Sequence, residues 1–415
     1  MQKIQSYKPL LISAGLGSIL GSGIIVGLSS TITVWQTGLG LSDGQVGIVS
    51  GALTFAIAIG SLLAGKLTKS LGLLNAYNNL DLGFLAGVVL CMLAQNYWML
   101  LIGAVLAGFF SGADLPISLT MISHDAPDKK TSAELVSASQ IYWTIGIIGA
   151  VLIAFVTSTL SGTLSPRIEM GALVLVAAIT VWMRKTNKNL RAIHEAAPKQ
   201  NTEQTKKVSM KEILFGSDKK YLSFLICILV FYCGWNLLAN TFGQFQTFML
   251  VKANASQSFA TGSGIVLNVV CLIVATLFSK IAGGKKRNVA FVAGIMIMVV
   301  SLCGLAMSAS NLWLIVAWIA FQNVGSTFAG EAMYKVWTQE SFPVEVRSDL
   351  QGFINGFSRL LCAAFATITP ILVLPEHIRT TMFGFAASIL VAGLFGMMQM
   401  KLQKKHGVGS LEKGE

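Results

Sequence analysis

Residues 10–34 read LLISAGLGSILGSGIIVGLSSTITV, an apolar stretch without a single charged side chain. Its length matches the roughly 20 helical residues that cross the hydrocarbon core of a bilayer. Hydrocarbon offers no hydrogen-bond partners, so a segment that spans a bilayer must pair its backbone N–H and C=O groups within the protein. Only α-helices and closed β-barrels do so. Because the apolar run is continuous and does not alternate with polar residues, it predicts a transmembrane helix.

The rest of the chain repeats this pattern eleven times. The further apolar runs are 45–67, 77–95, 98–124, 134–160, 168–184, 221–250, 257–281, 289–309, 312–338, 350–374 and 380–401. Only 12% of the 415 residues are charged, whereas a soluble domain carries roughly 25%. We therefore expect an all-α polytopic membrane protein with twelve transmembrane helices.

One long polar insert divides these helices into two sets of six. The division predicts an N-terminal half over 1–184, a cytoplasmic linker over 185–220, a C-terminal half over 221–401 and a cytoplasmic tail over 402–415. Within the linker, the amphipathic stretch 208–215 predicts a short interfacial helix.

The positions of the basic residues orient the chain. If both termini, the linker and alternate loops lie on one side, that side holds 26 of the 30 lysines and arginines. Basic residues concentrate in cytoplasmic loops, so both termini are expected to be cytoplasmic, in the cell (inner) membrane. The net charge of +12 then indicates topology and contact with anionic membrane lipid. It does not predict a nucleic-acid partner.

An internal repeat relates the two halves. Asp114 precedes Glu331 by 217 residues, and Pro127 precedes Pro343 by 216. In both places a helix reaches the predicted cytoplasmic surface, turns at the proline and gives way to the next helix. Parallel halves of this kind are a transporter architecture, with the substrate site between them near the bilayer midplane.

Four stretches carry recognisable motifs: residues 112–116 (GADLP), 140–146 (QIYWTIG), 235–243 and 337–347 (WTQESFPVEVR). They resemble the major facilitator superfamily, and within it the sugar-porter-like and metabolite:proton symporter branches. The resemblance covers nearly the whole chain. It implies two pseudo-symmetric six-helix halves and alternating access, with proton-coupled import of a sugar, polyol or sugar acid. A drug or metabolite exporter of the same fold is the alternative.

The sequence departs from the family pattern near the predicted inner gate. The loop between the second and third helices lacks the family's acidic residue and its basic pair, and the positions after the fourth helix lack Glu and Arg. The departures are Lys69, Leu73, Leu74, His124 and Thr131. The second half keeps Glu340 and Arg347, so we expect gate ion pairs in that half alone.

Acidic residues within the predicted helices are the candidates for proton coupling, because a charge in the bilayer costs from about 3 to over 10 kcal/mol. Asp114 and Glu331 are the predicted coupling residues. Alternatively, Asp114 forms a permanent contact with an arginine or the backbone, and Lys335 neutralises Glu331 along one helix face. Asp81 is expected at the inner-leaflet interface or in a helix contact.

Amide and tryptophan side chains recur on the fifth, seventh and tenth helices. Amides both donate and accept hydrogen bonds, and an indole ring stacks on the C–H face of a sugar. The predicted substrate-binding residues are Gln140, Trp143, Trp235, Asn236, Asn240, Gln244, Gln322, Asn323 and Arg359. The alternative is that the amides join neighbouring helices, and that Arg359 pairs with Glu331 instead of a substrate carboxylate.

No motif predicts an enzyme. The six cysteines lie in apolar stretches, and neither a metal-ligand spacing nor a phosphate-binding loop occurs. The sequence therefore predicts no cofactor and no metal. The expected partners are a small-molecule substrate, H+ as coupling ion and membrane lipid, for a chain that functions as a monomer.

Overall fold

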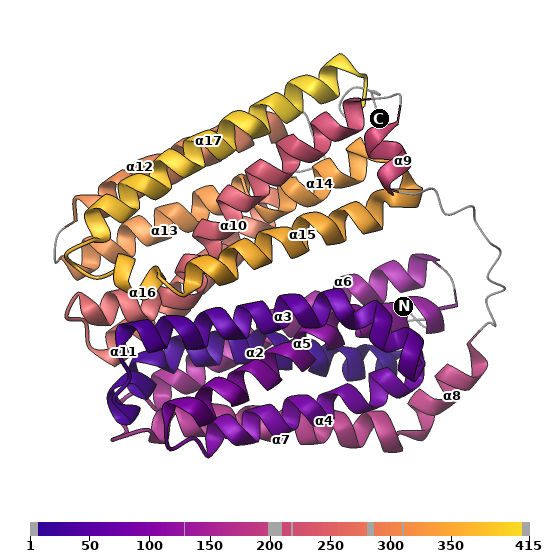
Figure 1. The fold of residues 1–415 in the computed structure, drawn as a ribbon, viewed down its shortest axis with the longest axis horizontal. Coiled ribbons are helices and arrows are strands. Elements are labelled where there is room, and N and C mark those ends of the chain that lie inside the picture. Colours follow the sequence, from indigo (N-terminus) through magenta and orange to yellow (C-terminus); the bar gives the residue numbers. More distant parts are fainter. Residues whose placement is uncertain are drawn as a thin grey trace. The chain divides into compact units, whose positions relative to one another are not determined.

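The computed structural model describes residues 7–127, 129–197, 210–216, 219–279, 286–308 and 311–408. All regular elements within these ranges are helices (Figure 1). The chain folds as two compact units. The first comprises helices α2 to α8 with two short later segments, Ser256–Gly262 and Ala366–Pro370, and the second comprises most of helices α9 to α17.

The first unit contains six long helices and one short one, coloured from indigo to magenta in Figure 1. They are α2 (Lys8–Leu39), α3 (Asp43–Leu71), α4 (Leu73–Met92), α5 (Tyr97–Asp125), α6 (Lys129–Val156), α7 (Leu164–Thr186) and α8 (Lys188–Ala196). The side chain of Ser42 accepts a hydrogen bond from Gln45 N and the Gln45 side chain accepts one from Ser42 N, which fixes the start of α3.

The remaining helices belong mostly to the second unit, although α11 and α16 begin in the first. They are α9 (Met210–Phe215), α10 (Lys220–Lys252), α11 (Gln257–Ser279), α12 (Arg287–Ala306), α13 (Leu312–Phe328), α14 (Glu331–Ser341), α15 (Val344–Ala366), α16 (Thr369–Leu372) and α17 (Ile378–Lys405). Helix α9 falls within the predicted interfacial stretch 208–215.

Each of the twelve predicted spans corresponds to helix in the structure, which confirms the predicted fold class. Among the described residues, nine helices are long and apolar enough to cross a membrane by length and composition. The tenth predicted span differs, because it is broken between α13 and α14 at Ala329 and Gly330. A side chain at Gly330 would overlap Ser326 O and the Trp235 indole, so the break is closely packed.

Helix α8 was not predicted within the linker. It begins at an Asn187 side chain that accepts a hydrogen bond from Leu190 N. Leu190 is fully buried in the core of the first unit. His194 Nδ1 contacts Asp125 Oδ2 at the end of α5, and its ring packs edge-on against Tyr77. These contacts fix the first turns of the linker to the helices that precede it.

Candidate functional site

A buried ion pair lies in the first unit. Asp114 of α5 is 2% exposed and accepts two hydrogen bonds from Arg184 of α7, at 2.6 Å from Nη1 to Oδ1 and 3.2 Å from Nη2 to Oδ2. Ser118 Oγ, one turn further along α5, donates to Asp114 Oδ2 at 3.2 Å. The arginine contact considered for Asp114 is therefore present, and Arg184 is its partner.

A second carboxylate shares the same guanidinium. Asp81 of α4 is 1% exposed, and its Oδ2 lies 2.9 Å from Arg184 Nη1. That nitrogen donates instead to Asp114 Oδ1 and to the Tyr77 carbonyl oxygen, so Asp81 Oδ2 accepts no hydrogen bond from any described residue. Of the two arrangements expected for Asp81, the helix contact is the one present, because its side chain points inward to Arg184 of α7 and not to the inner-leaflet interface.

Helix α2 closes this charge cluster. The Ser13 carbonyl oxygen accepts a hydrogen bond from Arg184 Nη2 at 3.1 Å, and the Tyr77 ring lies 4.0 Å from the guanidinium carbon, a cation–π distance. A Cβ at Gly17 would lie 2.7 Å from Arg184 Nη2 and would overlap Asp114 Oδ2. Glycine at position 17 thus leaves the space that the ion pair occupies.

Arg184 was not among the predicted site residues, because it stands at the end of the predicted helix 168–184 and was counted only among the basic residues of the cytoplasmic side. Its Cα lies near the end of α7, but its long side chain reaches back into the helix bundle. A signal was available: Asp81 and Asp114 lie in predicted helices and need a cation, and Arg184 ends another helix of the same half. A buried charge is expected to be paired.

Glu169 is a further buried carboxylate, and it was not among the predicted site residues. It lies on α7, is 1% exposed and packs against Gly27 of α2, where a Cβ would lie 2.8 Å from Glu169 Oε1. In the part of the chain that the structure describes, its Oε2 has no hydrogen-bond partner. Two glycines of α2, Gly17 and Gly27, therefore make room for buried ionisable side chains of α7, Arg184 and Glu169.

The second unit also buries an arginine. Arg287, at the start of α12, is 2% exposed and donates two hydrogen bonds of 2.9 Å to the carboxylate of Glu340 on α14. Gln403 of α17 donates to Glu340 Oε2 at 3.3 Å. Glu340 was predicted as a gate residue with Arg347, whose side chain lies outside the described residues. The partner that the structure describes, Arg287, was counted as part of a loop.

Glu331 and Arg359 do not pair with each other. Glu331 Oε1 lies 2.8 Å from Lys335 Nζ, and both side chains are half-exposed in their unit. The Arg359 Nε donates to Asn355 Oδ1 at 3.3 Å along α15. The neutralisation of Glu331 by Lys335 along one helix face is therefore the arrangement present in the second unit.

The predicted substrate-binding amides and tryptophans are partly engaged with other side chains. Trp235 Nε1 donates to Ser326 Oγ at 2.9 Å, and Asn236 Nδ2 donates to Ser358 Oγ at 3.0 Å. Both contacts join different helices, as the alternative interpretation required. Gln244 donates to Asn240 within α10.

Other members of this set offer unused polar atoms or lie outside the description. Gln322 is 2% exposed, and its Oε1 has no hydrogen-bond partner within the described ranges. Trp143 and Asn323 are half-buried, and the side chain of Gln140 lies outside the described residues. A substrate-binding role for these residues stays a prediction.

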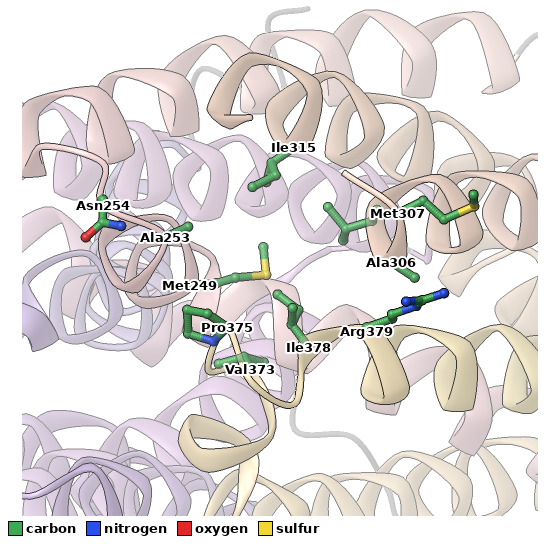
Figure 2. A pocket seen from close by; sticks show the side chains of 11 residues that line it. Met249, Ala253, Asn254, Ala306, Met307, Ile315, Val373, Pro375, Ile378 and Arg379 are labelled. Carbon is green, nitrogen blue, oxygen red and sulfur yellow. The ribbon is translucent and has the colours of Figure 1, made fainter. Parts of the chain in front are cut away.

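A cavity of about 420 Å³ lies at one end of the second unit (Figure 2). Met249, Ile315 and Ile378 line it, and Arg379 lies at its side. None of the predicted site residues borders it, so it lies apart from the polar side chains described above.

The helices and buried charges described above are those of a multi-pass membrane protein. Comparison with known sequences identifies its family. The chain belongs to the Major Facilitator Superfamily, whose family model matches residues 11–367. It is therefore a membrane transporter and not an enzyme. The family that the sequence motifs indicated is confirmed.

Individual relatives agree with this assignment. The chain is 26% identical over 401 residues to the minor myo-inositol transporter IolF of Bacillus subtilis (strain 168), covering 94% of this chain and 90% of that protein. It is 26% identical over 155 residues to a putative metabolite transport protein of Haemophilus influenzae, covering 36% of this chain and 37% of the relative.

Solved structures share the fold at low sequence identity. A D-xylose-proton symporter has a TM-score of 0.77 at 15% identity and covers 95% of this chain and 97% of its own. The nucleoside transporter NupG has a TM-score of 0.71 at 15% identity, with 95% and 99% covered. At these identities, the likeness establishes the fold.

Proposed function

We propose that this chain is a secondary active transporter that imports a sugar or polyol by alternating access and couples the movement to protons. It resides in the inner membrane with both termini in the cytoplasm and functions as a monomer. The substrate class is supported by the relative named as a myo-inositol transporter, which covers most of the chain, and by the amide and tryptophan side chains of α10 and α13.

The charge cluster of the first unit carries the coupling proposal. Two buried carboxylates, Asp81 and Asp114, share the single guanidinium of Arg184. With both carboxylates ionised the three groups carry a net charge of −1, and with one proton bound they carry none. Because a net charge is costly to bury, the cluster offers a place where one proton can bind and leave during a transport cycle.

Asp81 is the member of the pair best placed to hold that proton. Asp114 receives both hydrogen bonds that join it to Arg184, while Asp81 Oδ2 accepts none from the described chain. A carboxylate whose charge is hydrogen-bonded keeps that charge more readily than one that is not. Asp114 then anchors the arginine, and Glu331, its counterpart in the repeat, remains a second predicted coupling residue.

The test is uptake into proteoliposomes under an imposed pH gradient, with myo-inositol, xylose and a uronate as substrates. Wild type should accumulate its substrate against a concentration gradient when the outside is acidic. Asp81→Asn should lose this accumulation but keep substrate counterflow, which needs no net proton movement. Accumulation by Asp81→Asn at the wild-type level would refute the role of Asp81, and efflux driven by the same gradient would favour an exporter.

A further inference from the structure

A groove runs along the outside of the second unit between α12 and α17, which lie side by side in Figure 1. Its volume is about 680 Å³, and its walls include Val289, Val292, Met397 and Met400. Val289 is 71% exposed. Because a membrane protein turns such surface toward lipid, the apolar length of this groove is suited to a hydrocarbon chain.

Two lysines close one end of the groove. Lys401 and Lys404 lie three residues apart near the end of α17, so they project from the same face of the helix. Both are exposed, and none of the acidic residues that the structure describes forms an ion pair with either. Arg287 nearby is different, because it is buried against Glu340. The two lysines therefore present positive charge that no described carboxylate neutralises.

The start of α12 adds to this charge at the same end. The first turn of α12 contains no acidic residue, and no described side chain caps its backbone N–H groups. The helix is preceded by Lys286, which is exposed. Asn288 lines the groove, and its buried Oδ1 has no hydrogen-bond partner among the described residues. An uncapped helix N-terminus attracts anions through its unpaired N–H groups and its dipole.

We propose that this groove is a binding site for an anionic phospholipid of the cytoplasmic leaflet. The acyl chain lies along Val292 and Met397, and the phosphate lies between Lys401, Lys404 and the start of α12. Charge complementarity selects the headgroup, because basic pockets between transmembrane helices on the cytoplasmic side suit anionic lipid headgroups. None of the residues proposed for substrate binding or proton coupling lines this groove.

The experiment measures lipid binding to the purified, delipidated full chain by native mass spectrometry and by thermal unfolding in detergent. The probes are phosphatidylglycerol, phosphatidylcholine and inorganic phosphate. The test variant is K401Q/K404Q. Its control is K66Q/K69Q, which removes two exposed lysines with the same spacing from α3. A basic residue near an anionic membrane surface contributes a factor of about five to binding, so the test variant should bind phosphatidylglycerol about 25-fold more weakly, and the control should match wild type.

A second variant tests the apolar part of the groove. Val292→Trp fills the groove where Val292 is 40% exposed and leaves both lysines in place, so it should also weaken phosphatidylglycerol binding. Equal losses in K401Q/K404Q and K66Q/K69Q would overturn the proposal, because the effect would then be one of general surface charge. Stabilisation by inorganic phosphate as large as that by phosphatidylglycerol, or unchanged binding in Val292→Trp, would overturn the assignment to a lipid.

Discussion

The two units each bury an arginine, but they neutralise it differently. In the first unit Arg184 of α7 faces two carboxylates, Asp81 and Asp114, from α4 and α5. In the second unit Arg287 of α12 faces one carboxylate, Glu340 of α14, with an amide from α17 beside it. With all groups ionised, the first cluster carries a net charge of −1 and the second carries none. The two arginines are not equivalent in the internal repeat, because the offset of 216–217 residues pairs Arg184 with the end of α17 and not with Arg287. Of these two clusters, the first alone carries a net charge that one proton can cancel.

The clusters also differ in burial. The Arg184 side chain is fully buried and its two carboxylates are no more than 3% exposed, whereas the Glu340 side chain is 14% exposed. Breaking the first cluster should therefore be more costly, because water cannot reach the groups left unpaired.

The largest effect is expected from Arg184→Gln. This change leaves Asp81 and Asp114 buried without a cation, and removing one partner of a buried ion pair costs roughly 3 to 5 kcal/mol. We expect a large fall in the midpoint of thermal unfolding in detergent, together with loss of uptake. Wild-type thermal stability in this variant would contradict the arrangement of the first cluster.

Arg287→Gln should destabilise the protein less. Glu340 would keep the hydrogen bond from Gln403 and some access to water, so the cost is expected near that of an unsatisfied hydrogen-bonding group, about 1 to 3 kcal/mol. The two arginine variants should be compared in the same unfolding assay. A cost for Arg287→Gln equal to or greater than that of Arg184→Gln would reverse the comparison between the units.

Gly17→Ala tests the space that α2 leaves for the first cluster. The added Cβ would overlap Asp114 Oδ2, and overpacking of this kind costs roughly 1 to 3 kcal/mol. Gly149→Ala on α6 is the matched control, because nothing lies within 4 Å of the Cβ it would add. Circular dichroism during heating should show a lower unfolding temperature for Gly17→Ala and a wild-type unfolding temperature for Gly149→Ala. Equal unfolding temperatures in the two variants would mean that the cluster tolerates the added methyl group.

The smallest effect is expected from Glu169→Gln. The substitution preserves shape, and Oε2 has no partner to lose among the described residues. Because Glu169 is buried and the amide brings N–H donors of its own, the expected loss of stability is about 1 kcal/mol, the low end of the cost of an unsatisfied buried polar group. Asp114→Asn provides the contrast, since it weakens two hydrogen bonds to Arg184. A loss for Glu169→Gln as large as that for Asp114→Asn would reveal an ionised, partnered Glu169.

Hydropathy was sufficient to predict the helices, because every segment that crosses the hydrocarbon core must itself contain about 20 mostly apolar residues. It did not predict the break at Gly330, which depends on the packing of Trp235 against the chain. The position of Asp114 within a helix marked it as important, but its partner could not be found by counting loop charges. Arg184 lies near a helix end in the sequence, and only the length and direction of its side chain bring it into the core.

The amide residues show a different limit. Asn240 and Gln244 lie four residues apart in the sequence, which is one turn of α10, and the structure joins them by a hydrogen bond. Spacing says nothing about the neighbouring helix, however, and Ser326 and Ser358 already engage Trp235 and Asn236. Which amides remain available to a substrate depends on these partners.

The break between α13 and α14 bears on the charge of the transported solute. It gives α14 an N-terminus of its own, and Glu331 lies in the first turn of that helix. In transporters with interrupted helices, such N-termini attract anionic groups of the substrate through the helix dipole. Here the protein's own carboxylate already occupies that position. We therefore expect uncharged polyols and sugars to compete for transport more strongly than uronates of the same size.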